Sequence, residues 1–295
     1  TLDTTPNLDT IGFGSYTITV TDANGCVDSE TITVSEPDEY VSSYVITSIN
    51  NSFGVSCNGS TDGSIDITVY GGTSPHSYLW STGATTQDLD SIGAGTYVIT
   101  ATDTNGCQTT QTVIITEPDS LLSTYTTSAS ANDWNGYDIQ CNGDDNGEIT
   151  MDVTGGIDSL AYTYDIDGAS NGSNIFSSLS EGTYVITATD ANGCQTTQTV
   201  DMIAPDSSVV LTYTQSNYNG VGVSCHGDTD GFINTFVEGG VLDYIYIWTP
   251  TGDTTSSIDS IGFGSYTITV TDANGCVDSE TITVSEPDEY VFYSY

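Results

Sequence analysis

The cysteines are the residues whose chemistry is easiest to read, because they recur at regular positions. Four of them close the triplet Asn-Gly-Cys, at spacings of 81, 87 and 82 residues: Cys26, Cys107, Cys194 and Cys276. Three stand in Cys-(Asn/His)-Gly, spaced by 84 and 84 residues: Cys57, Cys141 and Cys225. One cysteine pair in each repeat indicates a disulfide framework formed in an oxidising compartment. The absence of any Cys-x-x-Cys spacing argues against zinc.

The pairing of these cysteines has three possible forms, of which pairing within each repeat is our first expectation. It joins Cys57 to Cys107, Cys141 to Cys194 and Cys225 to Cys276, and leaves Cys26 for a partner outside the chain. Each bond would close a loop of about 50 residues, worth roughly 4 kcal/mol on the chain-entropy model.

Geometry supplies an alternative to this pairing. In an immunoglobulin-like sandwich the two cysteine positions lie at opposite ends, about 20 Å apart for strands of about seven residues, which is beyond disulfide reach. Staples between consecutive repeats, Cys57 to Cys194 and Cys141 to Cys276, would avoid this conflict. Free thiols are the third possibility.

Acidic residues gather in the loop that follows the first cysteine of each repeat: Asp62, Asp144, Asp145, Asp228 and Asp230. Hard carboxylate oxygens suit Ca²⁺, which takes six to eight ligands, and linker acids such as Glu36 and Glu117 could add more. The loops lack the spacing of an EF-hand. Turns in which Asp accepts backbone hydrogen bonds explain the same residues without a metal, so both interpretations stay open.

Charge excludes several functions. The chain has 40 Asp and Glu and no Lys or Arg, a formal net charge of −40. It therefore offers no cation for nucleic acid or anionic lipid, and none to stabilise an oxyanion. Its two histidines, His76 and His226, lie in different repeats and share no catalytic motif. We expect a non-enzymatic protein that tolerates or needs salt or bound cations.

Membrane insertion is not expected either, since no apolar run approaches the roughly 18 residues of a membrane span. No signal peptide is present. The cysteine usage nevertheless indicates an extracellular location.

The elements that position the cysteines are short strands. Residues 64–70 alternate apolar Ile65 and Ile67 with polar neighbours, as a half-buried strand does. Residues 97–102 and 108–115 flank Asn105-Gly106 and are expected to form a hairpin with a type I′ turn. About seven such strands per repeat predict an all-β fold of tandem immunoglobulin-like β-sandwich modules of about 83 residues.

Repetition sets the expected domain boundaries. Residues 11–41 recur unchanged at 261–291, an offset of 250 residues that contains three modules. We expect sandwich repeats at residues 39–119, 120–206 and 207–288, the second half of a repeat at 1–38 and the start of another at 289–295. Short Pro-containing linkers such as Glu117-Pro118-Asp119 predict an elongated, semi-rigid rod.

Aromatic residues are expected in two structural roles. Trp80 and Trp248 should fill the cores of their modules, with Tyr162 and Tyr164 at the matching place in the module between them. Three tyrosines that follow Gly-containing turns resemble the tyrosine corner of immunoglobulin folds: Tyr97, Tyr184 and Tyr266.

The order of motifs resembles the SprB repeat, a module of giant surface adhesins of gliding Bacteroidetes-type bacteria. The resemblance is carried by CNGSTDGSI, a Gly-Gly pair, SYLWSTG and GTYVITATDTNGC, followed by a strand and Glu-Pro. His226 replaces the Asn of Cys-Asn-Gly, and His76 stands where the family tends to have Tyr. The resemblance implies type IX secretion and a role in adhesion or gliding motility at the cell surface.

Asp-(Ser/Thr)-apolar triplets also resemble the O-glycosylation motif of Bacteroidetes-type bacteria. Asp and Ser are common here, so chance matches are an alternative. The candidate hydroxyls are Thr10, Ser91, Ser120, Ser159 and Ser260.

Two functions fit these observations. The favoured one is a structural or adhesive stalk of a secreted, repetitive surface filament, whose partners are neighbouring copies of the array, laterally assembled chains and surfaces or polysaccharide. The other is a glycan-binding module array that uses exposed aromatics such as Tyr70 and Tyr162. In the alignment of repeats Tyr70 corresponds to Thr154 and Glu238, which weakens a repeated aromatic platform.

Overall fold

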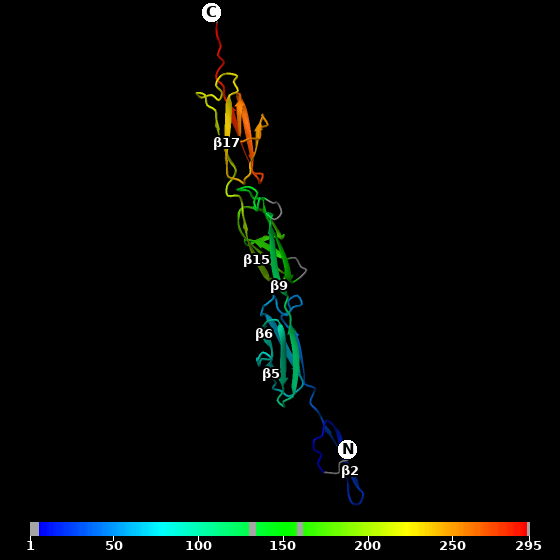
Figure 1. Ribbon diagram of the computed structural model, residues 1–295. Coiled ribbons are helices and arrows are strands. Elements are labelled where there is room, and N and C mark those ends of the chain that lie inside the picture. The colour runs from blue at the N-terminus through cyan, green and yellow to red at the C-terminus, as the bar shows by residue number, and fades with distance from the viewer. Residues whose placement is uncertain (1–5, 130–133, 158–161, 294–295) are drawn as a thin grey trace. The chain divides into compact units, whose positions relative to one another are not determined.

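The structure is a computed structural model that describes residues 6–129, 134–157 and 162–293 (Figure 1). The chain forms two units, residues 1–119 and 120–295, and each is described by itself. Nearly all regular structure is antiparallel β-sheet. In the part of the chain that is described, no helix has the length and apolar character needed to cross a membrane.

The first unit contains a hairpin and a sandwich. The hairpin pairs β1 (Gly14–Thr21) with β2 (Val27–Val34) along their whole lengths. The sandwich has two three-stranded sheets, in the orders β3-β4-β6 and β5-β7-β8. Their bounds are β3 (Val41–Ile46), β4 (Gly63–Tyr70), β5 (Ser77–Trp80), β6 (Leu89–Ile92), β7 (Gly95–Thr102) and β8 (Gln108–Ile115).

The second unit contains two sandwiches. In the first, the sheets have the orders β13-β10-β9 and β12-β11-β14-β15; the bounds are β9 (Asp119–Thr127), β10 (Gly147–Gly156), β11 (Thr163–Ile166), β12 (Ala169–Asn171), β13 (Ile175–Leu179), β14 (Gly182–Thr189) and β15 (Gln195–Met202). In the second, the orders are β16-β17-β19 and β18-β20-β21; the bounds are β16 (Val210–Gln215), β17 (Gly231–Glu238), β18 (Ile245–Thr249), β19 (Ser257–Ile261), β20 (Gly264–Thr271) and β21 (Val277–Val284).

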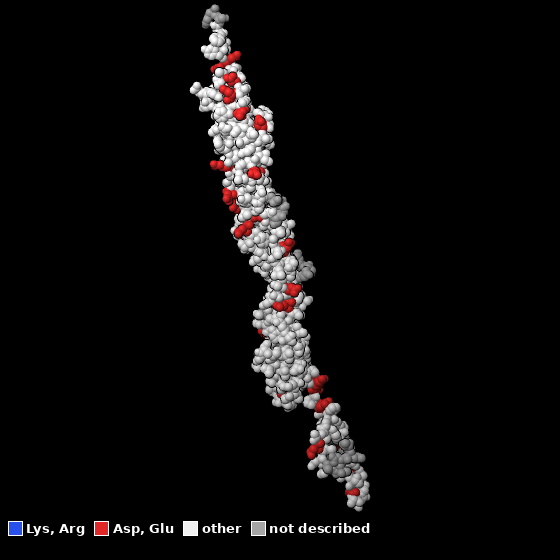
Figure 2. Space-filling view, in the orientation of Figure 1, with Lys and Arg blue, Asp and Glu red and all other residues white. Residues whose placement is uncertain are grey.

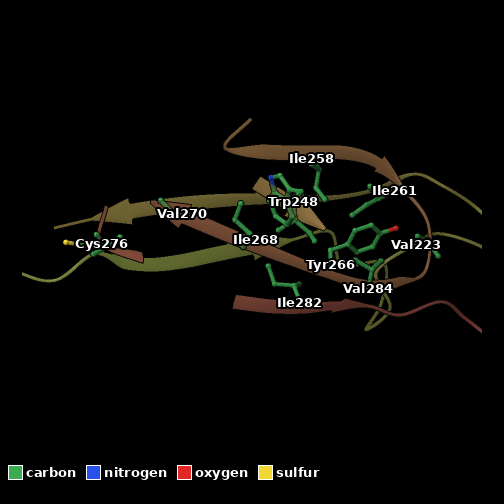
Figure 3. Packing of buried hydrophobic residues seen from close by; sticks show 12 residues of the cluster. Val223, Trp248, Ile258, Ile261, Tyr266, Ile268, Val270, Cys276, Ile282 and Val284 are labelled. Carbon is green, nitrogen blue, oxygen red and sulfur yellow. The ribbon is translucent and has the colours of Figure 1, made fainter. Parts of the chain in front are cut away.

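Each sandwich encloses its own apolar core, built from the inward residues of alternating strands. In β4, Ile65 and Ile67 are buried and Asp66 and Thr68 are exposed, as the alternation predicts. In the last sandwich Trp248 packs among Ile258, Ile268 and Ile282 (Figure 3). The predicted fold class, an all-β immunoglobulin-like sandwich, is confirmed.

The core aromatic of the middle sandwich was predicted at the wrong residue. Trp80 pairs with Ile99 and Trp248 with Ile268, and the residue that pairs with the corresponding Ile186 is Ile166. Tyr164 lies two positions earlier in the strand. The smaller Ile166 is accompanied by Met151 and Phe176 in that core, which supply volume where the other modules have Trp.

The tyrosine corner is confirmed in every copy. Tyr97 donates its hydroxyl to the carbonyl of Gly93 at 2.9 Å, Tyr184 to Ser180 at 3.0 Å and Tyr266 to Gly262 at 3.0 Å. Each bond spans four residues and fixes the start of a long strand to the turn before it.

The hairpin strands lie where the sequence placed them, but the turn between them is not type I′. A type I′ turn needs positive φ at both central residues. Of the predicted central residues, Asn105 and Gly106, only Gly106 has positive φ, at 86°. The Asp103 carboxylate instead accepts hydrogen bonds from the backbone N–H groups of Asn105 and Cys107. An Asx-type turn, a known preference of Asp, therefore replaces the predicted geometry.

Candidate functional site: a covalent joint between two sandwiches

A disulfide links the two sandwiches of the second unit. Cys141 and Cys276 are bonded with a Cα–Cα distance of 5.7 Å across a sequence separation of 135 residues. Cys57 and Cys194 are also disulfide-bonded, whereas Cys26, Cys107 and Cys225 are free and exposed. Our first expectation, pairing within each repeat, is therefore wrong at Cys107, Cys141 and Cys225, and the alternative staple between consecutive repeats is confirmed for Cys141–Cys276.

The physical reason is the distance between the two ends of a sandwich. Cys276 lies at one end of the last core, and Val223 and Val284, beside the loop of Cys225, lie at the other (Figure 3). The eight residues of β21 separate these ends, which corresponds to about 26 Å at 3.3 Å per residue. A bond from Cys225 to Cys276 cannot span that length.

The loop of the first cysteine is held against the linker that leaves its own sandwich. Asn58 donates to the carbonyl of Pro118 at 3.1 Å, and Asn142 donates to that of Pro205 at 2.8 Å. In the first module the Gly59 N–H also donates to the Glu117 carboxylate at 2.7 Å. This loop is thus held at the end of its sandwich from which the linker leaves.

The third copy of this loop keeps the same contact with a different side chain. Gly227 donates its N–H to Glu286 at 2.9 Å. His226, which replaces Asn, places its Nδ1 3.4 Å from the other Glu286 oxygen. The replacement of the usual Asn by His226 therefore preserves the attachment of the loop to the linker.

A reciprocal pair of amide side chains reinforces the disulfide. Gln140 donates to the backbone carbonyl of Asn274 at 2.9 Å, and Asn274 donates to the carbonyl of Gln140 at 3.1 Å. Asn135 adds a bond of 2.6 Å to the Asn274 side chain, which is only 6% exposed. We name Asn135, Gln140 and Asn274 the amide clamp. Since the buried amide of Asn274 would cost free energy without its hydrogen bonds, these bonds favour one docking geometry.

Sequence reasoning did not find the amide clamp. A signal was present in the Cys-x-Gly loops, because Gln140 precedes its cysteine where Ser56 and Ser224 precede theirs. The role of Gln140 becomes visible only in the structure, where this loop contacts the turn of the next module.

The turn that carries Cys276 is held in shape by contacts within its own sandwich. Asp272 is 3% exposed, and one of its oxygens accepts from the N–H groups of Asn274 and Cys276 at 2.9 and 2.8 Å. The other accepts from Val241 at 2.8 Å. Gly240 allows this approach, because a Cβ there would lie 2.7 Å from the Asp272 carboxylate.

The acids considered as calcium ligands serve these loops instead. Asp62 accepts from the N–H of Ser56 at 3.0 Å, and Asp230 from that of Ser224 at 3.0 Å. The hydrogen bond from the Ser56 side chain, followed by that from its N–H, lowers the pKa of Asp62, and the hydrogen bond from the Ser224 N–H lowers that of Asp230. Asp228 accepts from the Ser224 hydroxyl and Asp144 from Asn146; Asp145 is exposed.

The geometry of these loops does not fit a calcium site. In residues 6–129, 134–157 and 162–293, no group of three or more His, Cys, Asp or Glu side chains is arranged to hold a metal ion. Ca²⁺ needs six to eight oxygen ligands, and four of the five loop carboxylates, those of Asp62, Asp144, Asp228 and Asp230, already accept hydrogen bonds from backbone or side-chain donors.

Three of the five candidate glycosylation residues share an unusual backbone conformation. Thr10, Ser91 and Ser260 have φ of 61°, 58° and 57° and are exposed. Ser91 and Ser260 are the extra residues of β-bulges opposite Gly63 and Gly231. Ser120 is exposed in β9, and Ser159 lies outside the described residues.

The Asp and Glu side chains give the surface negative charge only. Asp and Glu are scattered over the face shown, with uncharged residues between them and no basic residue (Figure 2). His76 stacks on Tyr40 with ring centroids 5.3 Å apart, and His226 contacts Glu286. Both histidines therefore have structural contacts in separate modules.

Comparison with solved structures gives weak overall likeness. An adhesin described as Ca²⁺-stabilised, which helps an Antarctic bacterium to bind ice, is 15% identical, with a TM-score of 0.39 over 92% of this chain and 80% of that one. The eight N-terminal immunoglobulin domains of Down syndrome cell adhesion molecule are 10% identical, with a TM-score of 0.30 over 92% of this chain and 58% of that one. The chain thus spans less than two thirds of the latter structure.

Sequence comparison is more specific. No curated protein matches the chain. The SprB repeat matches at residues 54–85 and 137–171, stretches that contain the first cysteine, the strand after it and the region of the core aromatic. The resemblance drawn from the motifs is confirmed: these two stretches match the SprB repeat.

Proposed function

We propose that the chain is part of a surface adhesin-type repeat protein and acts as a stalk whose sandwiches are locked end to end. The observation that carries this proposal is the Cys141–Cys276 disulfide with its amide clamp, in which Asn274 is buried. A joint closed by a covalent bond and a specific set of hydrogen bonds resists both bending and separation. Such a joint serves reach and strength and has no evident use in catalysis.

The pairing rule extends along the array. The first cysteine of one repeat bonds the second cysteine of the following repeat, with repeats at residues 39–119, 120–206 and 207–288. Residues 1–38 and 289–295 are parts of further repeats. Type IX export and gliding motility belong to the same proposal and are supported by the SprB resemblance. Glycans at Thr10, Ser91, Ser120, Ser159 and Ser260 are proposed from the Asp-(Ser/Thr)-apolar triplets.

Glycan binding is less well supported. Tyr70, Thr154 and Glu238 hold the same place, the eighth residue counted from Gly63, Gly147 and Gly231. All three are exposed, and only one is aromatic. A shared carbohydrate platform would need the same aromatic in each copy.

The proposal is tested on intact cells that make the parent protein. Antibodies raised against residues 207–288 should label the surface without permeabilisation, and deletion of repeats should shorten the labelled filament and weaken attachment. Labelling that requires permeabilisation, or attachment unchanged by deletion but abolished by a soluble polysaccharide, would contradict the stalk.

A further inference from the structure

The hairpin β1–β2 displays the face that β20–β21 buries. Residues 11–41 and 261–291 are identical, yet Ile18 is 45% exposed where Ile268 is 0%, and Val20 is 65% exposed where Val270 is 0%. The difference lies in what covers them. In the last sandwich that cover comes from Val209, Val223, Ile233, Trp248 and Ile258.

The exposed hairpin already has the conformation that the covered one adopts. Its strands pair in the same register, from Gly14 opposite Val34 to Thr21 opposite Val27. Tyr16 donates to the carbonyl of Gly12 at 2.8 Å, as Tyr266 does to Gly262. Thr10 has φ of 61°, and its counterpart Ser260 has 57°. Binding would require little rearrangement.

We propose that β1–β2 binds the first half of a sandwich, a polypeptide of the kind formed by residues 207–250, and that the cysteine of this half, equivalent to Cys225, then bonds Cys107. We specify this binding partner because residues 261–291, identical to residues 11–41, pack against that half-sandwich in the last module. The inference concerns assembly and does not rest on adhesion.

Cys107 is chosen because the cysteine loop of the docked half-sandwich would lie at the end of the hairpin near Glu36. The loop of Cys225 is attached to Glu286, so a docked copy would lie at Glu36, the identical position. A few residues later, a Cβ on Gly71 would lie 2.2 Å from the Glu39 carbonyl oxygen and one on Gly72 2.8 Å from the Tyr40 ring, so these segments are in contact. Thr73 then donates to Asp103, the first residue of the turn that carries Cys107.

Spacing agrees with this choice. A copy of Cys225 placed 250 residues upstream falls 132 residues before Cys107, close to the separation of 135 between Cys141 and Cys276. Cys26 lies at the opposite end of β1–β2, eight residues of strand away. Geometry therefore excludes it as the partner.

The bond forms by thiol–disulfide exchange. The two cysteine thiols lose two protons and two electrons, and a low-molecular-weight disulfide such as oxidised glutathione accepts them and leaves as two thiols. Cys107 is exposed and free, as this exchange requires.

The test places a second copy of residues 207–250 directly before Thr1 of the full chain, where residues 1–10 continue as the equivalents of 251–260. After equilibration with oxidised and reduced glutathione, thiols are counted and non-reduced fragments are analysed by mass spectrometry. Glu-C is the protease, because the chain has no Lys or Arg for trypsin. The unaltered chain has three free cysteines; the extended chain should have two, Cys26 and the original Cys225.

Two matched variants and one independent readout decide the outcome. In the extended chain Cys107→Ser should leave the added cysteine free, whereas Cys26→Ser should leave the new bond intact. Amide exchange at Ile18 and Ile32 should slow at least tenfold. Unchanged exchange would overturn the docking, and protection of the hairpin with Cys107 still free, or with the added cysteine bonded to Cys26, would overturn the disulfide.

Discussion

The same 31 residues occur twice in this protein with different outcomes. At 261–291 they form strands β20 and β21 of a closed sandwich, and at 11–41 they form a hairpin whose apolar side chains are exposed. Turn, register and tyrosine corner are alike in both. Local sequence therefore determines the hairpin, and burial is supplied entirely by the other half of the sandwich.

The largest expected difference comes from truncating one isoleucine in each copy. Ile268→Ala should lower the free energy of unfolding of the last sandwich by about 2–5 kcal/mol, because it leaves a cavity beside Trp248. Ile18→Ala, the same change on the exposed hairpin, should cost about 0.5 kcal/mol or less. Urea unfolding followed by tryptophan fluorescence measures the effect of Ile268→Ala, and amide exchange of the hairpin at increasing urea measures that of Ile18→Ala; equal effects would break the comparison.

Removing the joint should have the next largest effect. Cys141→Ser with Cys276→Ser opens a closure that spans 135 residues, and we expect a loss of about 2–5 kcal/mol. Cys107→Ser is the control, since that thiol is free and its loss should be silent. Calorimetry of the oxidised proteins checks this, and a loss from Cys107→Ser of similar size would contradict the pairing.

Replacing the aspartate of the hairpin turn should also affect the stability of the two copies differently, by a smaller amount. Asp272→Ala removes an acceptor for three backbone N–H groups in a buried site and should cost about 1–3 kcal/mol. Asp22 holds the exposed turn of the hairpin through Asn24 and Cys26. Asp22→Ala should therefore leave the unfolding of the last sandwich unchanged. A shift in that transition would show that the hairpin contributes to it.

The stability of the first sandwich should depend on pH through the carboxyl of Asp103. The N–H of Thr73, followed by those of Cys107 and Asn105, lowers the pKa of Asp103. A carboxyl whose pKa is depressed on folding contributes stability above its unfolded pKa, near 3.9, and this is lost as the pH falls through the folded pKa. The urea midpoint should fall below about pH 4, less steeply in Asp103→Asn. An equal slope in this variant would refute the assignment.

Calcium should have the smallest effect. Because Asp62 and Asp230 are engaged with loop N–H groups, millimolar EDTA should leave the melting temperature within about 1 °C at constant ionic strength. Sodium chloride at the same ionic strength is the control for screening of the −40 charge. A rise of several degrees with Ca²⁺ alone would indicate ligands that the loops do not reveal.

Features encoded within a few residues were predictable from the sequence. The alternation in β4, the hairpins and the tyrosine corners depend on neighbours in one or two strands, and they were found. The position of Ile166 was missed because register depends on a pairing with Ile186 from another part of the module. The type I′ turn was missed because the Asp103 side chain competes for the backbone donors.

The candidate site was only partly predictable for the same reason. Sequence repetition located the cysteines but favoured the wrong partners, although strand length already opposed them. The amide clamp joins Gln140 to Asn274, 134 residues away, and no local pattern reports such a contact. Pairing across a joint depends on which ends of two folded sandwiches meet, and that is a property of the assembled chain.

The Cys141–Cys276 bond has a consequence for damage. Everything between these residues, including the Ala204-Pro205-Asp206 linker, lies inside one covalent ring. A protease that cuts the backbone once inside the ring opens it into a branched chain and does not sever it, so the parts on either side stay attached. Two cuts, or one cut together with a reductant, would be needed to release a fragment.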